Sequence, residues 1–336
     1  MKRGAGILGC SGPALTDAER GFFAETRPYG FILFARNIDT PDQVRRLCAD
    51  LRDAVGHDAP ILIDQEGGRV QRLRPPHWRE HLPPLDQIRI AGPQGAARSM
   101  YLRSRLIAAE LYDLGIDVNC APTCDVARAE THPFLLNRCY GDDPQTVAKM
   151  ARAVVQGQAD GGVLSIIKHI PGHGAGQVDS HLELPRVDLP LDQLQAADFA
   201  PFKALSDVPF AMTAHIVYPA LDPDRPATTS PAAIAAIRDQ IGYPGALMSD
   251  DISMQALLGS IADRSRDALA AGCDLILHCN GDMDEMCDVM AVSGTLNGAA
   301  LARAQSALDC RRAPQPVDIA ALEDELEALL KGAVHG

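Results

Sequence analysis

The segment 168–181, which reads KHIPGHGAGQVDSH, concentrates side chains that can carry out acid–base chemistry. It contains a lysine, an aspartate and three of the ten histidines in the chain, and histidine is the side chain that titrates near neutral pH. The segment follows an apolar run, 163–167, that is typical of a buried strand. Its three glycines at alternate positions allow tight bends or movement. We therefore predict an active-site loop that begins where a buried strand ends.

Asp179 and His181 form an Asp-x-His pair within this segment. If the loop turns so that the two side chains converge, the carboxylate orients the imidazole and stabilises its protonated form. His181 is then a candidate general acid and base near neutral pH.

Two adjacent carboxylates, Asp250 and Asp251, follow the apolar run 245–248 and a serine. Neighbouring carboxylates repel each other, and their desolvation at a strand end is costly without hydrogen-bond donors. Because Asp251 precedes a possible helix, we expect it to cap or position that segment, and we assign the functional role to Asp250. A carboxylate nucleophile on a strand end and an imidazole on a loop together suit stepwise displacement at an acetal carbon.

Another strand end carries a carboxylate and arginines, in the segment 64–72, which reads DQEGGRVQR. Asp64 with such arginines suits hydrogen bonding to a polyhydroxylated or charged ligand. The alternative is a solvated loop with internal ion pairs. Arg138 and His215 are ambiguous by themselves, because a single histidine at a strand end is as often a satisfied core residue as a ligand contact.

The composition restricts the class of protein and its partners. The chain has 336 residues and a formal net charge of −13, without a block rich in lysine and arginine, which argues against nucleic acid and anionic membranes as partners. The nine cysteines are scattered and form no Cys-x-x-Cys pair, which suits reduced cytosolic thiols better than disulfides or a structural zinc site. The apolar stretch near residue 7 is shorter than a signal core, and no later stretch approaches a membrane span. We therefore expect a cytoplasmic protein.

Short apolar runs alternate with amphipathic segments along most of the chain. Eight runs are predicted to be strands: 6–9, 30–34, 60–64, 116–121, 163–168, 210–215, 246–250 and 274–278. Helices are predicted between them, and three should begin at a capping residue followed by proline: Thr40-Pro41, Asp143-Pro144 and Ser230-Pro231. Three glycines are predicted to follow helix ends: Gly115, Gly157 and Gly242.

The residues that end the strands distinguish a barrel from an open sheet. The side chains at or next to these ends are Asp64, Lys168, His169, His215, Asp250 and His278. Chemistry at the carboxyl ends of many strands is typical of an eight-stranded barrel, whereas an open sheet gathers its ligand at one switch point. No Gly-x-Gly-x-x-Gly or Walker-type loop occurs. We predict an α/β fold, a single (β/α)8 TIM-type barrel domain over residues 1–336, with two extra C-terminal helices from about residue 298.

Three motifs together resemble glycoside hydrolase family 3, and within it the bacterial β-N-acetylhexosaminidases of cell-wall recycling. They occur in the order typical of the family and are the segments 64–72, 168–174 with 179–181, and 249–254. Two positions depart from the usual pattern: Ile170 stands where phenylalanine is common, and Cys139-Tyr140 where Ser-Phe is usual. Both departures keep apolar bulk and bear on the shape of the pocket more than on its chemistry.

The resemblance implies a retaining mechanism through a covalent glycosyl-enzyme, with Asp250 as nucleophile and His181, paired with Asp179, as acid and base. It implies that the terminal N-acetylglucosamine is held by Asp64, Arg72, Arg138, Lys168 and His169. No metal or organic cofactor is implied. The expected enzyme is a cytoplasmic exo-β-N-acetylglucosaminidase, and its substrates are N-acetylglucosaminyl-β-1,4-anhydro-N-acetylmuramyl species with or without peptide. The oligomeric state is left open.

Three other functions stay open on the sequence alone. One is a phosphorylase on the same scaffold, because a histidine repels an attacking phosphate less than a carboxylate does. Another is a metal-dependent barrel hydrolase with candidate ligands His169, His173, His181, His215 and Asp250. Against it, no His-x-His follows the first strand, no His-Glu-x-x-His occurs, and Lys168 would repel a divalent cation. The third is a sugar- or peptide-binding barrel without catalysis, in which the Asp179–His181 pair would have no purpose.

Overall fold

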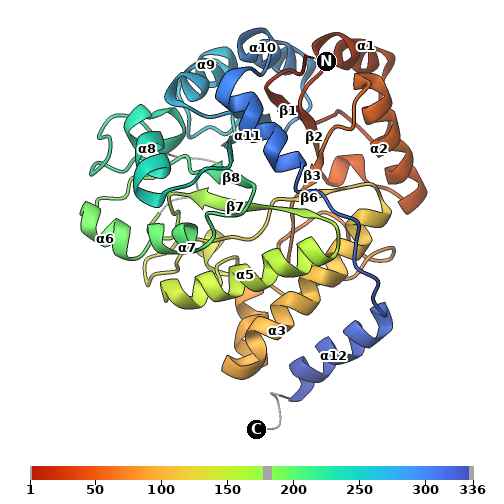
Figure 1. Ribbon diagram of the computed structural model, residues 1–336, viewed down its shortest axis with the longest axis vertical. Coiled ribbons are helices and arrows are strands. Elements are labelled where there is room, and N and C mark those ends of the chain that lie inside the picture. Colours follow the sequence, from red (N-terminus) through yellow and green to blue (C-terminus); the bar gives the residue numbers. More distant parts are fainter. Residues whose placement is uncertain (1, 177–183, 333–336) are drawn as a thin grey trace.

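Eight parallel strands close into a barrel in the computed structural model, which describes residues 2–176 and 184–332 (Figure 1). Around the barrel they are β1 (Gly6–Leu8), β2 (Gly30–Leu33), β3 (Ile61–Ile63), β6 (Val118–Asn119), β7 (Leu164–Ile170), β8 (Phe210–Thr213), β9 (Ala246–Asp251) and β10 (Leu275–His278). β10 pairs with β1 and closes the ring. An antiparallel hairpin of β4 (Gln65–Gly67) and β5 (Val70–Gln71) follows β3 directly. The predicted barrel is confirmed, with several strands shorter than predicted.

Side chains of the strands alternate between the interior of the barrel and the layer beneath the helices. Ile7 and Ile32 belong to the interior cluster, whereas their neighbours Leu8 and Phe31 belong to the cluster between strands and helices. All four side chains are buried. The interior is therefore a packed core and not a channel.

Helix α11 (Gly298–Leu308) covers the end of the barrel at which the strands begin. Its Ala304, Ala307 and Leu308 join the interior apolar cluster, and the Tyr29 hydroxyl donates to the carbonyl oxygen of Ala304 at 2.7 Å. Figure 1 shows this helix lying across the barrel. The end at which the strands finish is left for a functional site.

The helices that follow the strands form the outer layer. They are α1 (Asp17–Thr26), α2 (Pro41–Val55), α3 (Pro84–Asp113), the short α4 (Pro133–Leu136), α5 (Pro144–Asp160), α6 (Leu191–Ala196), α7 (Phe199–Ala204), α8 (Pro231–Ala236), α9 (Ile261–Ala271) and α10 (Met283–Ser293). The predicted starts are confirmed, because Thr40, Asp143 and Ser230 each accept a backbone N–H of the first turn ahead of a proline. Within the described ranges, no helix is both long and apolar enough to cross a membrane.

Two of the three glycines that were predicted to follow helix ends do so. Gly115 comes after α3 with a φ of 80°, and Gly242 ends the π-helical turn after α8 with a φ of 77°. Gly157 instead lies inside α5, which continues to Asp160. A Cβ atom at position 157 would be 2.5 Å from the carbonyl oxygen of Tyr101 on α3. The prediction for Gly157 was wrong because this glycine serves the close approach of two helices, which sequence spacing does not reveal.

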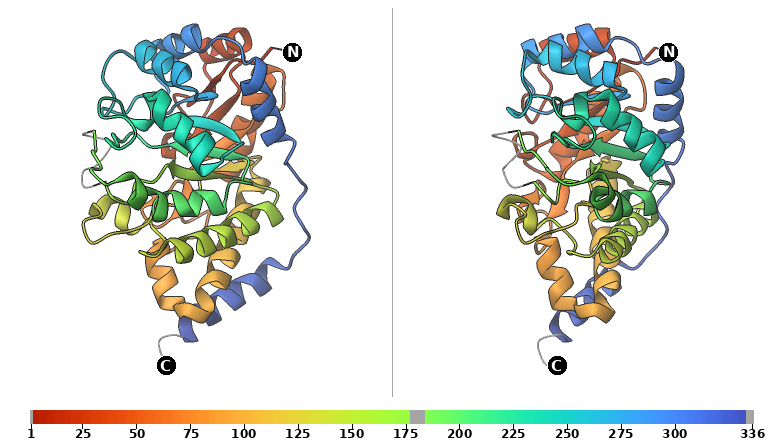
Figure 2. Two further views of the ribbon diagram at one scale, coloured as in Figure 1. Left: turned by 60° about the vertical axis from the view of Figure 1, so that its left-hand side comes forward. Right: turned by 90° about the vertical axis from the view of Figure 1, so that its left-hand side faces the viewer.

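Helix α12 (Ile319–Gly332) packs against α3 outside the barrel (Figures 1 and 2). Its Leu322 and Leu326 join Leu102 and Leu106 of α3 in a separate apolar cluster. The two predicted C-terminal helices are therefore present, and they have different positions: α11 covers the end of the barrel, whereas α12 extends the outer layer.

Replacing Gly157 with alanine should lower the free energy of unfolding by about 1–3 kcal/mol, because the new Cβ must push α3 and α5 apart. Gly21 in α1 is the matched control, since a Cβ atom there meets no atom within 4 Å. Alanine at such an open helix position stabilises by up to about 1 kcal/mol. Urea unfolding of both variants beside the wild type measures these changes, and equal stability of the two variants would contradict the packing role of Gly157.

Candidate active site

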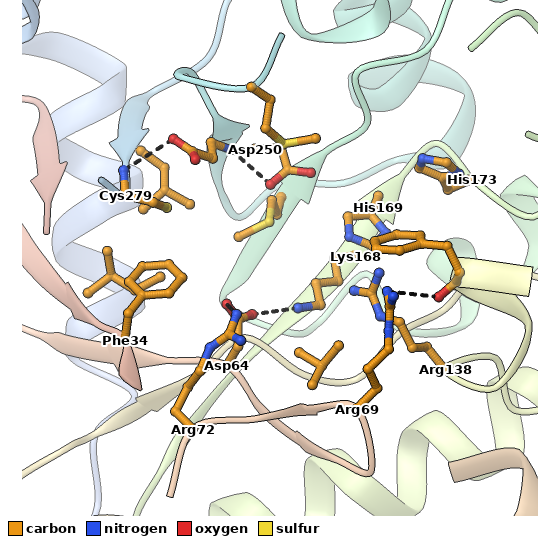
Figure 3. Close-up of a pocket in the computed structure, with 17 residues that line it drawn as sticks. Phe34, Asp64, Arg69, Arg72, Arg138, Lys168, His169, His173, Asp250 and Cys279 are labelled. Carbon is orange, nitrogen blue, oxygen red and sulfur yellow. Dashed lines mark hydrogen bonds and ion pairs between the residues drawn. The ribbon is translucent and has the colours of Figure 1, made fainter. Parts of the chain in front are cut away.

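A cavity of about 230 Å³ opens at the carboxyl end of the barrel (Figure 3). Its lining includes side chains at or after the ends of β2, β3, β7, β8, β9 and β10. Six predicted site residues line it together: Asp64, Arg72, Arg138, Lys168, His169 and Asp250. The other two, Asp179 and His181, lie outside the described residues.

Asp64 follows β3 and is held by two cations. Lys168 donates from Nζ to its Oδ1 at 2.8 Å, and Arg72 donates from Nη2 to its Oδ2 at 3.1 Å (Figure 3). Burial alone would raise the pKa of the Asp64 carboxyl, but Lys168 and Arg72 hold that pKa far below its ordinary value. Asp64 is therefore an anion at neutral pH whose remaining lone pairs can accept hydrogen bonds from a ligand.

Glu66 joins Asp64, Arg72, Arg138 and Lys168 in a group of five paired charges, and the sequence analysis did not identify it. Arg138 donates to its carboxylate through both Nε at 2.9 Å and Nη2 at 2.8 Å, and Lys168 Nζ lies 2.7 Å from its Oε1. These cations outweigh burial and lower the pKa of Glu66 to about 2. The spacing of Asp64 and Glu66 could have identified Glu66 from the sequence, because residues two apart in an extended chain share a face.

His169 reaches the cavity next to Lys168 because the pairing of β7 with β8 is irregular between Lys168 and Ile170. Its Nδ1 lies 2.8 Å from Oδ2 of Asp125, a fully buried carboxylate that the sequence analysis also missed. The Asp125 carboxylate further accepts the backbone N–H groups of His169 at 3.2 Å and His173 at 2.6 Å. With Nδ1 directed at a carboxylate, the His169 ring has a fixed orientation.

His173 also lines the cavity, with its ring 5.5 Å from the His169 ring. Burial and the nearby His169 lower the pKa of His173 to about 4. His173 is therefore neutral near pH 7 and contributes no positive charge to the binding of an anion.

Asp250 ends β9 and faces the cavity. The backbone N–H of Asp251 donates to its Oδ1 at 2.8 Å. Burial would raise the pKa of the Asp250 carboxyl, but His169, His215 and this N–H together hold it below the ordinary value. Asp250 is therefore a half-buried, ionised carboxylate that faces the cavity, as a carboxylate nucleophile requires.

Asp251 has a positioning role. Its carboxylate accepts the backbone N–H of Ser253 at 3.1 Å, the Ser253 hydroxyl at 2.8 Å and the backbone N–H of Cys279 at 3.1 Å. These bonds tie the turn after β9 to the end of β10. The prediction of a possible helix after Asp251 is wrong, because turns follow and α9 begins only after the cap Ser260. A turn forms here because the Asp251 carboxylate accepts hydrogen bonds from donors in two loops.

His215 is a satisfied core histidine next to the site. Its Nε2 lies 3.0 Å from the carbonyl oxygen of Asp251, and its Nδ1 lies 2.7 Å from Oγ1 of Thr228. Burial lowers the pKa of His215. Both ring nitrogens are engaged. The geometry therefore favours a satisfied core histidine over a ligand contact, the two interpretations that the sequence left open.

The metal-dependent alternative finds little support in the described part of the chain. There, no group of three or more histidine, cysteine, aspartate or glutamate side chains is arranged to hold a metal ion. Lys168 and Arg138 also line the cavity beside His169 and Asp250, and their positive charges disfavour a divalent cation there.

The described part of the loop after β7 is held by close backbone contacts. A Cβ atom at Gly172, with its φ of 139°, would be 2.7 Å from Cβ of Asp198, and one at Gly174 would be 1.8 Å from the carbonyl oxygen of Val126. The Tyr218 hydroxyl donates to the carbonyl oxygen of Gly172 at 2.7 Å. At positions 172 and 174 the glycines therefore serve close packing rather than movement.

Asp198 stands behind this loop, immediately before α7. It is fully buried, and its Oδ2 accepts a hydrogen bond from Nη2 of Arg128 at 2.5 Å. Burial raises the pKa of the Asp198 carboxyl to about 6, against the opposing charge of Arg128.

Paired carboxylates and cations together with a separate ionised carboxylate line an open cavity at the carboxyl end of a parallel barrel, which is typical of a TIM-barrel enzyme site for a polar substrate such as a sugar. Residues 15–309 match the model of a family described as the glycosyl hydrolase family 3 N terminal domain. The chain belongs to glycosyl hydrolase family 3 and is a glycoside hydrolase. The resemblance to glycoside hydrolase family 3 that was inferred from the three motifs is thereby confirmed.

The similarity to known proteins extends over most of the chain. A beta-hexosaminidase of Alkalilimnicola ehrlichii is 38% identical over 286 residues, which cover 83% of this chain and 82% of the relative. A beta-hexosaminidase of Xanthomonas campestris pv. campestris is 36% identical over 303 residues, covering 88% and 90%. The crystal structure of native NagZ from Neisseria gonorrhoeae matches with a TM-score of 0.85 at 30% identity, covering 100% of this chain and 99% of that one.

Replacing Asp198 with asparagine should stabilise the protein at neutral pH more than at acidic pH. A carboxyl with a raised pKa contributes stability that is present at low pH and is lost as the pH rises through about 6, and asparagine does not titrate. Between pH 4 and pH 8, the free energy of unfolding of Asp198→Asn should therefore rise relative to the wild type by about 2 kcal/mol.

Urea unfolding at the two pH values measures this change. Asp207→Asn is the control: a surface pair with Arg152 lowers the pKa of Asp207, so this group titrates below the pH window and the relative stability of the variant should stay nearly constant between pH 4 and pH 8. An equal change in both variants would contradict the assignment for Asp198.

Proposed function

We propose that the protein is a retaining exo-β-N-acetylglucosaminidase that works through a covalent glycosyl-enzyme on Asp250, with His181 as acid and base and Asp179 as its partner. The observation that carries the proposal is the ionised carboxylate of Asp250, which lines the same cavity as the paired side chains Asp64 and Lys168. The relatives that are called beta-hexosaminidases support N-acetylhexosaminides as the substrate class.

The reaction takes two steps. In the first, a carboxylate oxygen of Asp250 bonds to the anomeric carbon of the bound sugar while the bond from that carbon to the leaving oxygen breaks. Protonated His181 gives its proton to the leaving oxygen, so the aglycone departs as a neutral alcohol. In the second step, His181 takes a proton from a water that attacks the same carbon, and the Asp250 carboxylate is released. Two inversions retain the configuration of the sugar.

The wall formed by the paired charges suits the hydroxyl groups of one terminal sugar. Asp64 supplies acceptors, and Lys168 and Arg138 supply donors, so each can bond a hydroxyl group. The barrel interior below is packed with side chains. A cavity of about 230 Å³ with a closed base accommodates the end of a saccharide and not its middle, which supports exo-acting cleavage.

We extend the proposal to N-acetylglucosaminyl-β-1,4-anhydro-N-acetylmuramyl species, with or without peptide, as natural substrates in cytoplasmic peptidoglycan recycling. This part rests on the resemblance of the three motifs to the bacterial branch of the family. The nine cysteines are all free thiols, which supports a reducing compartment.

The experiment that tests the proposed function is phenol release from an aryl β-N-acetylglucosaminide, with and without EDTA and with and without phosphate. Release that survives EDTA and yields N-acetylglucosamine in phosphate buffer supports the hydrolase. Formation of N-acetylglucosamine 1-phosphate would instead favour the phosphorylase. Loss of activity in EDTA would favour the metal-dependent hydrolase.

Replacing Asp250 with alanine should reduce kcat for the aryl substrate by about 10⁴-fold or more, because no side chain remains to form the glycosyl-enzyme. Asp263→Ala, at an exposed position at the start of α9, is the matched control and should retain wild-type kcat. Thermal unfolding checks that both variants are folded. Substantial turnover by Asp250→Ala would rule out its role as nucleophile.

Replacing His181 with alanine should reduce activity most on substrates with poor leaving groups. A general acid contributes about 10²–10⁴-fold when the leaving group needs a proton, whereas an activated nitrophenol leaves with little assistance. The measurement compares kcat/KM for a nitrophenyl glycoside and for a disaccharide in the variant and the wild type. An equal loss on both substrates would count against His181 as the acid.

A further inference from the structure

Glu66 lies behind the wall of the cavity and not in it. Asp64, Lys168 and Arg138 line the cavity, whereas the Glu66 side chain is 1% exposed and contacts Lys168 and Arg138 from behind. We propose that Glu66 is a positioning residue that fixes which N–H groups of Lys168 and Arg138 are available to the sugar. This inference rests on the proposed function and deepens it, because it assigns the origin of affinity for the terminal sugar.

The hydrogen-bonding capacity of the two cations defines the role. The Lys168 ammonium has three N–H groups; Asp64 and Glu66 engage two of them, at 2.8 and 2.7 Å, which leaves one for a ligand. The Arg138 guanidinium gives its Nε and one Nη2 hydrogen to Glu66, which leaves the Nη1 side for a ligand. Glu66 therefore sets the direction of the remaining donors on both residues.

The Glu66 carboxylate is itself held in place through its backbone. Arg103, a buried side chain, donates from Nη2 to the carbonyl oxygen of Glu66 and from Nη1 to Oε1 of Gln87 at 3.2 Å. The flanking Gln65 accepts the backbone N–H groups of Arg72 at 2.9 Å and of the next residue at 3.1 Å. Glu66 is thus a rigid anchor, and the long side chains of Lys168 and Arg138 are the parts that it orders.

The charge balance gives the same residue an electrostatic effect. Two carboxylates, Asp64 and Glu66, offset the charges of Arg72, Arg138 and Lys168. Burial alone would lower the pKa of the Lys168 ammonium, and Asp64 and Glu66 together raise it above its ordinary value. Without Glu66, three cations share one carboxylate. Lys168 should then lose its proton at a lower pH, and Lys168 and Arg138 should repel each other.

The test is Glu66→Gln, which keeps the size of the side chain and removes its charge. KM for the aryl β-N-acetylglucosaminide should rise about 10–100-fold, as expected when the outer partner of a binding residue is lost, while kcat falls less than about threefold because Asp250 is untouched. Glu110→Gln is the matched control: the Glu110 side chain is 10% exposed and pairs with Arg79 at 2.6 Å outside the cavity, so KM should stay at the wild-type value.

Glu66→Asp keeps the charge and shortens the reach. Its KM should therefore lie between the values for Glu66→Gln and the wild type, and Glu66→Asp replaces Glu66→Gln in the test if that variant does not fold. Wild-type KM in the folded variants would overturn the inference, as would a loss confined to kcat.

The two proposals fail in different ways. If the wild type does not cleave the aryl substrate, the proposed function fails, and calorimetric binding of N-acetylglucosamine to the wild type and Glu66→Gln then tests Glu66 alone. Weaker binding in the variant would support its positioning role, whereas equal binding, or no binding to either protein, would overturn it. If the wild type is active and Glu66→Gln is indistinguishable from it, only the inference about Glu66 fails.

Discussion

The attraction between five paired charges at the carboxyl end of the barrel is the interaction on which the rest of the site depends. Asp64, Glu66 and Arg72 come from the hairpin after β3, Arg138 from the loop after β6, and Lys168 from β7. Each of these charges would be costly to bury alone, and removing one partner leaves the other without compensation. The hairpin after β3, the loop after β6 and strand β7 are therefore tied together, and the cavity wall that they form is set before any ligand arrives.

The aspartate carboxylates around the site differ in pKa and in role because their neighbours differ. Asp250 has imidazoles and a backbone N–H around it and stays ionised, whereas Asp198 is buried with a single cation and has a pKa of about 6. Asp125 and Asp251 use their oxygens to hold other loops in place. Proximity to the cavity alone therefore does not define a reactive group; the set of hydrogen-bond donors around it does.

The sequence predicts the parts of this molecule that depend on residues close together in the chain. Periodicity and capping residues locate the strands and most helix starts, and strand ends such as Asp64, Lys168 and Asp250 fall in one cavity because barrel topology brings all strand ends to one rim. Glu66 and Asp125 escape sequence reasoning because their partners, Arg138 and His169, are distant in the chain.

Glycines and short turns show the same limit. Gly157 is required by a neighbouring helix, and Gly172 and Gly174 are required by neighbouring loops, none of which is visible in the local sequence. A helix after Asp251 is locally plausible, but the Asp251 carboxylate accepts hydrogen bonds from Ser253 and from Cys279, which follows β10, and a turn forms. Local propensity fails at these positions because tertiary contacts outweigh it.

The closure of the barrel by α11 has a kinetic consequence. Since side chains fill the barrel axis and α11 covers its far end, the cavity is a blind pocket, and whatever binds at its base must leave through the mouth by which it entered. Under the exo-acting cleavage proposed above, the aglycone lies towards the mouth and departs first, and the sugar at the base leaves last. A free sugar that remains in the pocket blocks the next substrate, so the enzyme should follow an ordered release with competitive inhibition by its own monosaccharide product.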